Sequence, residues 1–137
     1  MIGPFDGRYS FLSNFYRSPV TLDGLEYPSV EHAYQAAKTT DPEERATVRE
    51  ALTPGLAKRL GRQVHLRPDW EDVKLAVMAD LLRQKFDRPP LAKALLETGD
   101  EELVEVNYWR DTYWGVFHGT GENHLGRLLM ERREQLR

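Results

Sequence analysis

The sequence predicts a compact, mainly helical α+β protein. Apolar residues recur at three- and four-residue spacing in several segments, most clearly between residues 69 and 86. One hairpin pattern covers residues 19–27, with Asp23-Gly24 at the expected turn. The chain of 137 residues carries no linker, repeat or low-complexity tract, and its length suits a single domain, residues 1–137, with one core.

The first predicted helix follows the hairpin directly. Ser29 is a good N-cap, because its side-chain oxygen can accept a hydrogen bond from an unpaired backbone N–H. Glu31 lies in the first turn, where negative charge suits the helix dipole. The helix continues through Lys38, and Pro42 stops or restarts it.

Further helices are predicted from their start and stop signals. Asp41-Pro42 and Thr53-Pro54 each combine an N-cap residue with proline at the first helical position, and Gly61 is a candidate C-cap. Asp69 is a plausible N-cap for the long core helix that extends to Phe86. Pro89-Pro90 is expected to break that pattern before a short helix over residues 91–98.

The C-terminal third is predicted to be less regular. Residues 102–106 alternate like a short strand, and an aromatic, loop-like stretch over residues 107–115 follows. This stretch either packs against the strand or forms a stacking wall for a planar heterocycle. Asn123 caps or precedes the last helix, and the glycine-rich turn before it is a weak candidate for binding an anion through backbone N–H groups.

Composition narrows the function. The 19 basic and 22 acidic residues give a net charge of -3, which argues against binding nucleic acid by bulk electrostatics but leaves a local basic patch open. The chain has no cysteine, which excludes disulfides, thiolate nucleophiles and cysteine metal ligands. We see neither a secretory signal nor an apolar run long enough for a bilayer, so we expect a cytoplasmic protein without a membrane partner.

One helix face combines several reactive side chains. Glu31, Tyr34, Gln35 and Lys38 fall on the same side of the first predicted helix, which brings an acid, a phenol, an amide and an amine together. Such a face is either a solvated charged surface or a buried acid–amine pair with the shifted pKa values of an enzyme site. Two other lysines, Lys74 and Lys85, lie among apolar neighbours and either snorkel or reach a pocket.

Familiar catalytic layouts are missing. There is no Gly-x-Ser-x-Gly elbow or Walker loop, and the four histidines lack zinc-site spacing, so we expect neither a metal nor a cofactor. Carboxylates, an amine, amides and aromatic rings suit a reaction through a sugar-like cation, with the aromatic rings holding a planar base. An amine with a lowered pKa could instead trap an opened sugar aldehyde as a Schiff base.

Several motifs in order resemble the NADAR family, also called YbiA-like. They are residues 11–16 with Pro19, residues 28–38, and Arg67-x-Asp69-Trp70. The match continues through Lys74, Met78 and residues 85–86, 95–98 and 103–105, and closes with residues 111–115 and 121–132. The resemblance covers almost the whole chain and implies a compact, mainly helical α+β domain that acts on N-glycosidic bonds. Some members resemble hydrolases of phosphoribosylamino-pyrimidines, early intermediates of riboflavin biosynthesis. Others remove ADP-ribose from guanine in DNA and are paired with a DNA ADP-ribosyltransferase.

Carried over position by position, the resemblance implies two catalytic residues. Lys38 is the candidate amine, which attacks C1 of the ribose or stabilises the opened sugar, and Glu31 tunes this amine or shuttles its proton. Trp70 and Trp114 would flank the base, and Arg67 would meet phosphate. The remaining implied substrate-binding residues are Ser13, Asn14, Phe15, Asp69, Glu105, Asp111, Gly115 and Asn123, of which Asp111 and Asn123 would contact ribose hydroxyls or base edges.

Three functions stay open at this stage. The first is an N-glycosidase of small ribosylaminopyrimidines, and the second is an ADP-ribosylglycohydrolase acting on guanine in DNA. The third is a non-catalytic module that binds ADP-ribose or a nucleotide, which would keep its ligand when Lys38 or Glu31 is replaced. The substrate or ligand is accordingly a nucleotide-like small molecule or an ADP-ribosylated nucleic acid.

Overall fold

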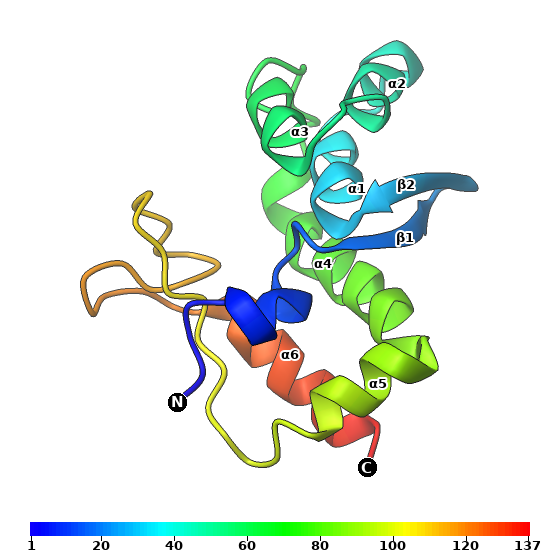
Figure 1. The fold of residues 1–137 in the computed structure, drawn as a ribbon. Coiled ribbons are helices and arrows are strands. Elements are labelled where there is room, and N and C mark those ends of the chain that lie inside the picture. The colour runs from blue at the N-terminus through cyan, green and yellow to red at the C-terminus, as the bar shows by residue number, and fades with distance from the viewer. The chain divides into compact units, whose positions relative to one another are not determined.

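The structure is a computed structural model that describes residues 1–137 (Figure 1). It confirms the predicted fold class, because six α-helices and one 3-10 helix accompany a single two-stranded antiparallel sheet. In chain order the elements are η1 (Gly7–Leu12), β1 (Arg17–Leu22), β2 (Leu25–Ser29), α1 (Val30–Ala37), α2 (Pro42–Arg49), α3 (Pro54–Leu60), α4 (Trp70–Asp87), α5 (Pro89–Leu96) and α6 (His124–Gln135).

The elements fall into two units, which we describe separately. The first is formed by the two ends of the chain, Met1–Ser13 and Phe86–Arg137, and contains η1, α5 and α6. The second is Asn14–Lys85, which contains the hairpin, α1, α2, α3 and nearly all of α4. None of the helices is both long and apolar enough to span a membrane.

The predicted hairpin is confirmed. Val20 lies opposite Tyr27 and Leu22 opposite Leu25, so the strands are joined by Asp23 and Gly24 alone. Both turn residues have positive φ angles, 48° and 84°, which is the conformation a type I′ turn requires and the reason Asp-Gly suits it. The turn therefore sets the register of the sheet.

The helix α1 lies at the centre of the Asn14–Lys85 unit. Ser29 caps it as predicted, because its side chain accepts a hydrogen bond from the N–H of His32. The helix contacts both strands and also α2 and α3, as Figure 1 shows for the cyan helix between the blue strands and the green helices. As a result, all eight of its residues are buried, the polar ones included.

The helices α2, α3 and α4 begin where their signals predict. Asp41 and Thr53 cap α2 and α3 through their side chains, with Pro42 and Pro54 in the first turns, and Gly61 is the C-cap of α3. The helix α4 extends from Trp70 to Asp87 as one continuous element. These boundaries are local in origin, which is why sequence signals find them.

The expected break at Pro89-Pro90 needs a correction. The two prolines do separate α4 from the next helix, but they lie inside α5 and form its first two residues. The fixed φ of proline suits the first turn of a helix, where the missing N–H has no intrahelical partner. The expected helix over residues 91–98 thus begins two residues earlier and ends at Leu96.

The strand expected over residues 102–106 is wrong. This segment makes only isolated bridges, from Leu103 to Ile2 and from Val106 to Val116. The N–H of Val106 donates to the carbonyl of Val104, two residues back, and this local bond bends the chain. Alternating apolar residues therefore mark a half-buried segment here without a ladder beside it.

The start of α6 is closed by backbone carbonyl groups. Asn123 precedes the helix with a φ of 54° and makes no side-chain cap. Four successive N–H groups, those of residues 122–125, instead donate to carbonyls of residues 112–115. These four donors are already used and are not available to an anion at the start of α6.

The buried His32 joins α1 to the end of α2. Its Nε2 lies 3.0 Å from the carbonyl oxygen of Ala51, and its Nδ1 lies 2.7 Å from the hydroxyl of Ser29. A carbonyl oxygen only accepts, so Nε2 carries the proton and Nδ1 accepts from Ser29. Burial lowers the pKa of His32, which keeps the ring neutral at pH 7.

Because folded His32 is neutral, we expect the stability of the protein to be sensitive to acid. Between the lowered pKa of folded His32 and the unfolded value of about 6.5, the unfolded chain binds more protons, so the free energy of unfolding falls as pH drops below about 6.5. Urea unfolding at pH 7.5 and pH 5 measures this, and His32→Gln should lose less stability over that interval than the wild type. His65→Ala serves as the control: Glu44 raises the pKa of the exposed His65, which therefore stabilises the fold at low pH, so this variant should lose at least as much stability as the wild type. An equal loss in His32→Gln and the wild type would contradict the assignment.

Candidate active site

The polar face of α1 is buried. The exposed fraction is 7% for Glu31 and 4% for Gln35, and Tyr34 is buried beside them. The alternative of a solvated charged surface is therefore wrong for these residues. A carboxylate removed from water is the situation in which pKa values shift and proton transfer becomes useful.

Glu31 is held by its neighbour on the helix. The Gln35 side-chain nitrogen donates to Glu31 Oε1 at 2.9 Å. The Gln35 side chain lies against Gly61, where a methyl group would come within 2.0 Å of Gln35 Oε1. Gly61 thus allows the end of α3 to approach α1 closely and fixes the amide that orients the carboxylate.

Lys38 lies at the C-terminal end of α1, and the pKa of its amine is lowered. The residue is the C-cap of the helix, and its side chain is half-buried. Burial lowers the pKa of Lys38, Glu31 raises it, and Arg62, Lys58 and Lys74 lower it further. The balance is downward, so more of this amine is neutral and nucleophilic near pH 7 than for an ordinary lysine.

Aromatic rings lie beside this amine. The ring of Tyr34 lies 5.7 Å from Lys38 Nζ and packs on Trp70, with ring centroids 5.2 Å apart and planes tilted by 57°. Trp70 is buried and packs against Tyr34, and we call these two rings the aromatic wall. Its predicted role in flanking a base stays a prediction.

Arg67 and Asp69 form a two-bond ion pair. The guanidinium donates to the carboxylate at 2.6 and 3.0 Å, which lowers the pKa of Asp69 and raises that of Arg67. The backbone N–H of Arg67 also donates to the carbonyl of Lys38 at 2.7 Å. The backbone hydrogen bond joins this segment to the end of α1 at Lys38. A phosphate bound at the Arg67 guanidinium would have to compete with the Asp69 carboxylate.

Asn14 and Phe15 lie where the chain leads into the hairpin. The carbonyl of Asn14 accepts from the N–H of Glu31 at 3.1 Å, which places Asn14 against the first turn of α1. Its side-chain nitrogen contacts the sulfur of Met78 at 3.6 Å, and its buried Oδ1 has no hydrogen-bond partner. Phe15 is exposed. The Oδ1 is thus an unsatisfied buried acceptor close to the first turn of α1.

Lys85 is the second unusual amine. It is fully buried, so the snorkelling alternative is wrong, and its Nζ lies 5.5 Å from the centre of the Tyr16 ring. Burial lowers the pKa of Lys85 to about 7. The signals for this residue in the sequence are its apolar neighbours and the family motif at residues 85–86, and neither separates a snorkelling lysine from a buried one.

The other predicted site residues belong to the unit formed by the chain ends. Asp111 Oδ1 accepts from the backbone N–H groups of Tyr113 and Trp114, at 3.1 and 2.9 Å. The ring of Trp114 stands edge-on to that of Tyr113, at 4.8 Å between centroids. Asp111 therefore shapes the turn that presents the Trp114 ring, and direct ribose contact by either residue stays a prediction.

Asn123, Glu105 and Gly115 fix the same loop. Asn123 Oδ1 accepts from the N–H of Glu105, and its Nδ2 donates to the carbonyl of Leu103. Gly115 approaches so closely that a methyl group would lie 2.1 Å from the Glu105 carbonyl oxygen. Both ends of the Asn123 amide are used by the backbone, which favours a structural role over recognition of a base edge. Ser13 is half-buried at the end of η1, where its N–H donates to Ser10.

Asn107 is a structural residue that sequence reasoning missed. Its Oδ1 accepts from the N–H groups of Trp109 and Asp111, and its Nδ2 donates to the carbonyls of Asp111 and Val116. One buried amide thereby holds the whole turn. The signal in the sequence is an asparagine four residues before an aspartate, a spacing that suits side-chain-closed turns.

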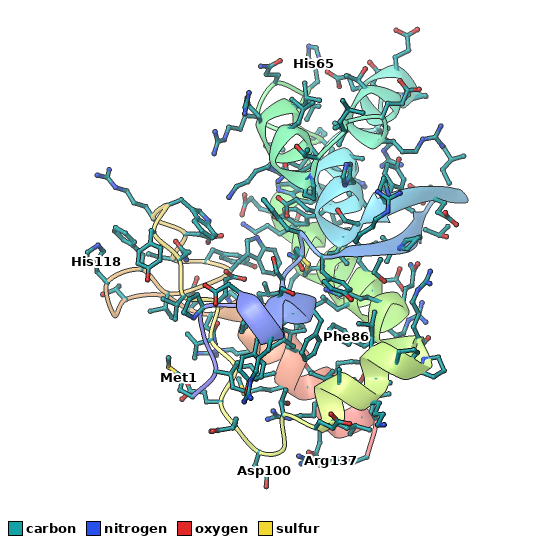
Figure 2. All side chains as sticks on the ribbon, in the orientation of Figure 1. Met1, His65, Phe86, Asp100, His118 and Arg137 are labelled. Carbon is teal, nitrogen blue, oxygen red and sulfur yellow. The ribbon has the colours of Figure 1, made fainter.

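The histidines and carboxylates do not gather. No group of three or more such side chains is placed to hold a metal ion. Figure 2 shows His65 on the loop between α3 and α4 and His118 on the loop before α6. His32 is enclosed between Ser29 and Ala51, as described above.

The Asn14–Lys85 unit therefore brings together a buried acid, an amine of lowered pKa, an aromatic wall and an unsatisfied amide oxygen, which is the equipment of an enzyme site. The family model for the NADAR domain matches residues 3–137. The chain belongs to the NADAR family, as its motifs predict.

Named relatives are similar along most of the chain. It is 44% identical to the N-glycosidase YbiA of Escherichia coli over 132 residues, which cover 93% of this chain and 82% of that protein. It is 38% identical to an N-glycosidase of Nostoc punctiforme, covering 94% and 86%. A riboflavin biosynthesis protein of Vibrio vulnificus is 42% identical over 135 residues, but this chain spans only 36% of that protein's length.

A solved structure matches the fold. The NMR structure of E. coli YbiA superimposes with a TM-score of 0.86 at 42% sequence identity, covering 98% of this chain and 82% of that one. The fold described above is therefore the fold of that protein.

Proposed function

We propose that this protein hydrolyses the N-glycosidic bond of a ribosylaminopyrimidine phosphate through Lys38 and Glu31. The protein is an N-glycosyl hydrolase, the class to which its relatives of 38–44% identity belong. The observation that carries the lysine–glutamate site is the buried polar face of α1, which ends in an amine of lowered pKa. The substrate class is supported by the names of relatives, among them the riboflavin biosynthesis proteins of V. vulnificus and Zea mays.

The chemistry follows from the two groups. The Lys38 amine forms a bond to C1 of the ribose as the bond from C1 to the base nitrogen breaks, and the departing nitrogen takes a proton that Glu31 can deliver. The bond from C1 to the ring oxygen then breaks as a proton moves from the lysine nitrogen to that oxygen, so the opened sugar is held as a Schiff base on Lys38. One water molecule hydrolyses this adduct, which releases the sugar phosphate and restores the amine. The aromatic wall beside Lys38 suits a planar leaving group.

The test is a product assay by mass spectrometry on two substrates in parallel. One reaction contains a ribosylaminopyrimidine phosphate, and the other contains a DNA oligonucleotide ADP-ribosylated on guanine, each with Lys38→Ala as the control. Release of ribose 5-phosphate only by the wild-type protein supports the proposal. Release of ADP-ribose alone would reassign the substrate, and ligand binding without product in either reaction would identify a binding module.

One observation favours the DNA substrate as a second candidate. Tyr108 is 76% and Trp109 54% exposed, on the turn that the Asn107 amide holds. Exposed aromatic rings on a fixed turn suit stacking on the bases that flank a modified nucleotide. A partner DNA ADP-ribosyltransferase belongs to this second candidate, whereas a cytoplasmic location is proposed for either substrate.

The pH dependence of turnover tests the role of Lys38. The amine must be neutral to attack, so kcat/KM should rise with pH up to the pKa of Lys38, and this limb should lie below the ordinary lysine value of about 10.4. The measurement is kcat/KM from pH 5.5 to 10 with the phosphorylated substrate. A flat profile across this range would remove Lys38 from the rate-determining chemistry.

A further inference from the structure

Three cationic side chains lie within electrostatic reach of the Lys38 amine. Lys58 and Arg62 belong to the segment at the end of α3 that packs against α1, and Lys74 lies in α4; the charges of all three also lower the pKa of Lys38. The whole protein has a net charge of -3, so positive charge is concentrated here against the overall balance. Such a concentration raises the local potential for an anion.

The backbone holds these cations in place. The contact between Gly61 and Gln35 brings the end of α3 against α1, one turn before Lys38. The N–H of Arg62 donates to Arg59 and that of Gln63 to Leu60, so the chain stays helical past the end of α3. Residues 58 and 62 are four apart and therefore lie on one face of this segment.

The side chains differ in their existing partners. Lys74 is paired with Glu71, with 2.6 Å between Nζ and the carboxylate, and only 14% of its side chain is exposed. Arg62 is exposed, has no side-chain hydrogen bond or ion pair, and lies directly after the glycine that approaches Gln35. Its planar guanidinium can donate two parallel hydrogen bonds to a phosphate, whereas the guanidinium of Arg67 is already used by Asp69.

We propose that Arg62, assisted by Lys58, forms a phosphate subsite beside Lys38 that anchors the sugar phosphate while its C1 reacts. This inference rests on the proposed function and moves the phosphate contact from Arg67 to Arg62. The shared chemistry is a phosphate ester on a ribose, which a ribose 5-phosphate group or the diphosphate of an ADP-ribosyl group both supply. The bound anion also neutralises the cations that surround the amine.

The first test is binding without turnover. Isothermal titration measures the affinity of the full chain for inorganic phosphate, ribose 5-phosphate and ADP-ribose, in the wild type, Arg62→Gln, Lys58→Gln and Arg59→Gln. We expect Arg62→Gln to weaken binding by about 10- to 100-fold, the effect of one charge-assisted hydrogen-bonded contact. Arg59→Gln is the matched control. It removes the same charge from an exposed neighbour that is not among the cations acting on Lys38, so the binding affinity should stay within about twofold of the wild type.

The three ligands separate the two sources of phosphate. If the subsite accepts both sources of phosphate, the affinities for ribose 5-phosphate and for ADP-ribose should both fall in Arg62→Gln. If it accepts one source, only the affinity for the tighter-binding ligand should fall. Wild-type protein that binds none of them, or Arg62→Gln that binds them normally, would overturn the subsite.

The second test measures the pKa of the Lys38 amine. NMR titration of isotope-labelled Lys38 should give a higher pKa in Arg62→Gln than in the wild type, because a repelling charge has been removed. An unchanged Lys38 pKa would contradict the placement of Arg62. If phosphate binding depends on Arg62 while no substrate is turned over, the subsite stands and the proposed function fails. If turnover occurs and Arg62→Gln leaves KM and phosphate affinity unchanged, the proposed function stands and the subsite fails.

Discussion

Replacing Lys38 by alanine should abolish turnover of the phosphorylated N-glycoside, with a loss in kcat of at least about 1,000-fold. The amine is the nucleophile of the proposed mechanism, and its pKa is lowered by burial. Lys38→Arg keeps the positive charge but removes the nucleophile, so it should lose activity to a similar extent. Steady-state kinetics with the phosphorylated substrate measures both variants.

Trapping the intermediate identifies the amine. Borohydride added during turnover should reduce the Schiff base and leave a sugar adduct on Lys38, which peptide mass spectrometry locates. Lys85 is the internal comparison, because burial lowers its pKa to about 7 and makes it the other amine with nucleophilic character. An adduct on Lys85, or normal turnover by Lys38→Ala without an adduct, would sink the assignment. Ligand binding that survives Lys38→Ala with no product from the wild type would favour the binding module.

The sequence predicts this site in part because its framework is local. The Ser29 cap, the Asp23-Gly24 turn and the two Pro-started helices depend on neighbouring residues, and all are confirmed. The spacing of Glu31, Gln35 and Lys38 places them on one helix face for the same reason. Helix geometry alone, however, gave no decision between a solvated and a buried face.

Burial of that face comes from distant segments. The strands, α2 and α3 all contact α1, and Gly61 lets α3 approach Gln35. No pattern within residues 29–38 encodes these neighbours. The cations around Lys38 are likewise supplied by residues 58, 62 and 74, so the lowered pKa of the amine is a property of packing.

The C-terminal loop shows the opposite case, in which polar motif residues have their hydrogen bonds inside the fold. Asp111 and Asn123 both bind backbone groups, and the resemblance to a family does not distinguish such residues from ligand contacts. The strand expected at residues 102–106 failed because the segment has partners only at single points. Motif membership therefore identifies which residues matter to the fold and site together.

Gly115 gives the sharpest test of this structural reading. A methyl group at this position would lie 2.1 Å from the Glu105 carbonyl oxygen and 2.8 Å from Asn107 Nδ2, so the backbone itself would have to move. Gly115→Ala should destabilise the protein by about 3 kcal/mol. Thermal unfolding should show this as a drop in Tm of roughly 10 °C for a chain of this length.

Gly55→Ala is the matched control, because it adds the same methyl group where the nearest atom is 3.9 Å away, inside α3. Alanine is the better helix former, so this variant should keep or raise the Tm. The free energy of unfolding should rise by up to about 1 kcal/mol. A Gly115→Ala protein with unchanged Tm and no turnover would contradict the structural reading and place Gly115 against the substrate. A lowered Tm with turnover preserved below it would show that Gly115 serves catalysis only by letting the loop close on Glu105.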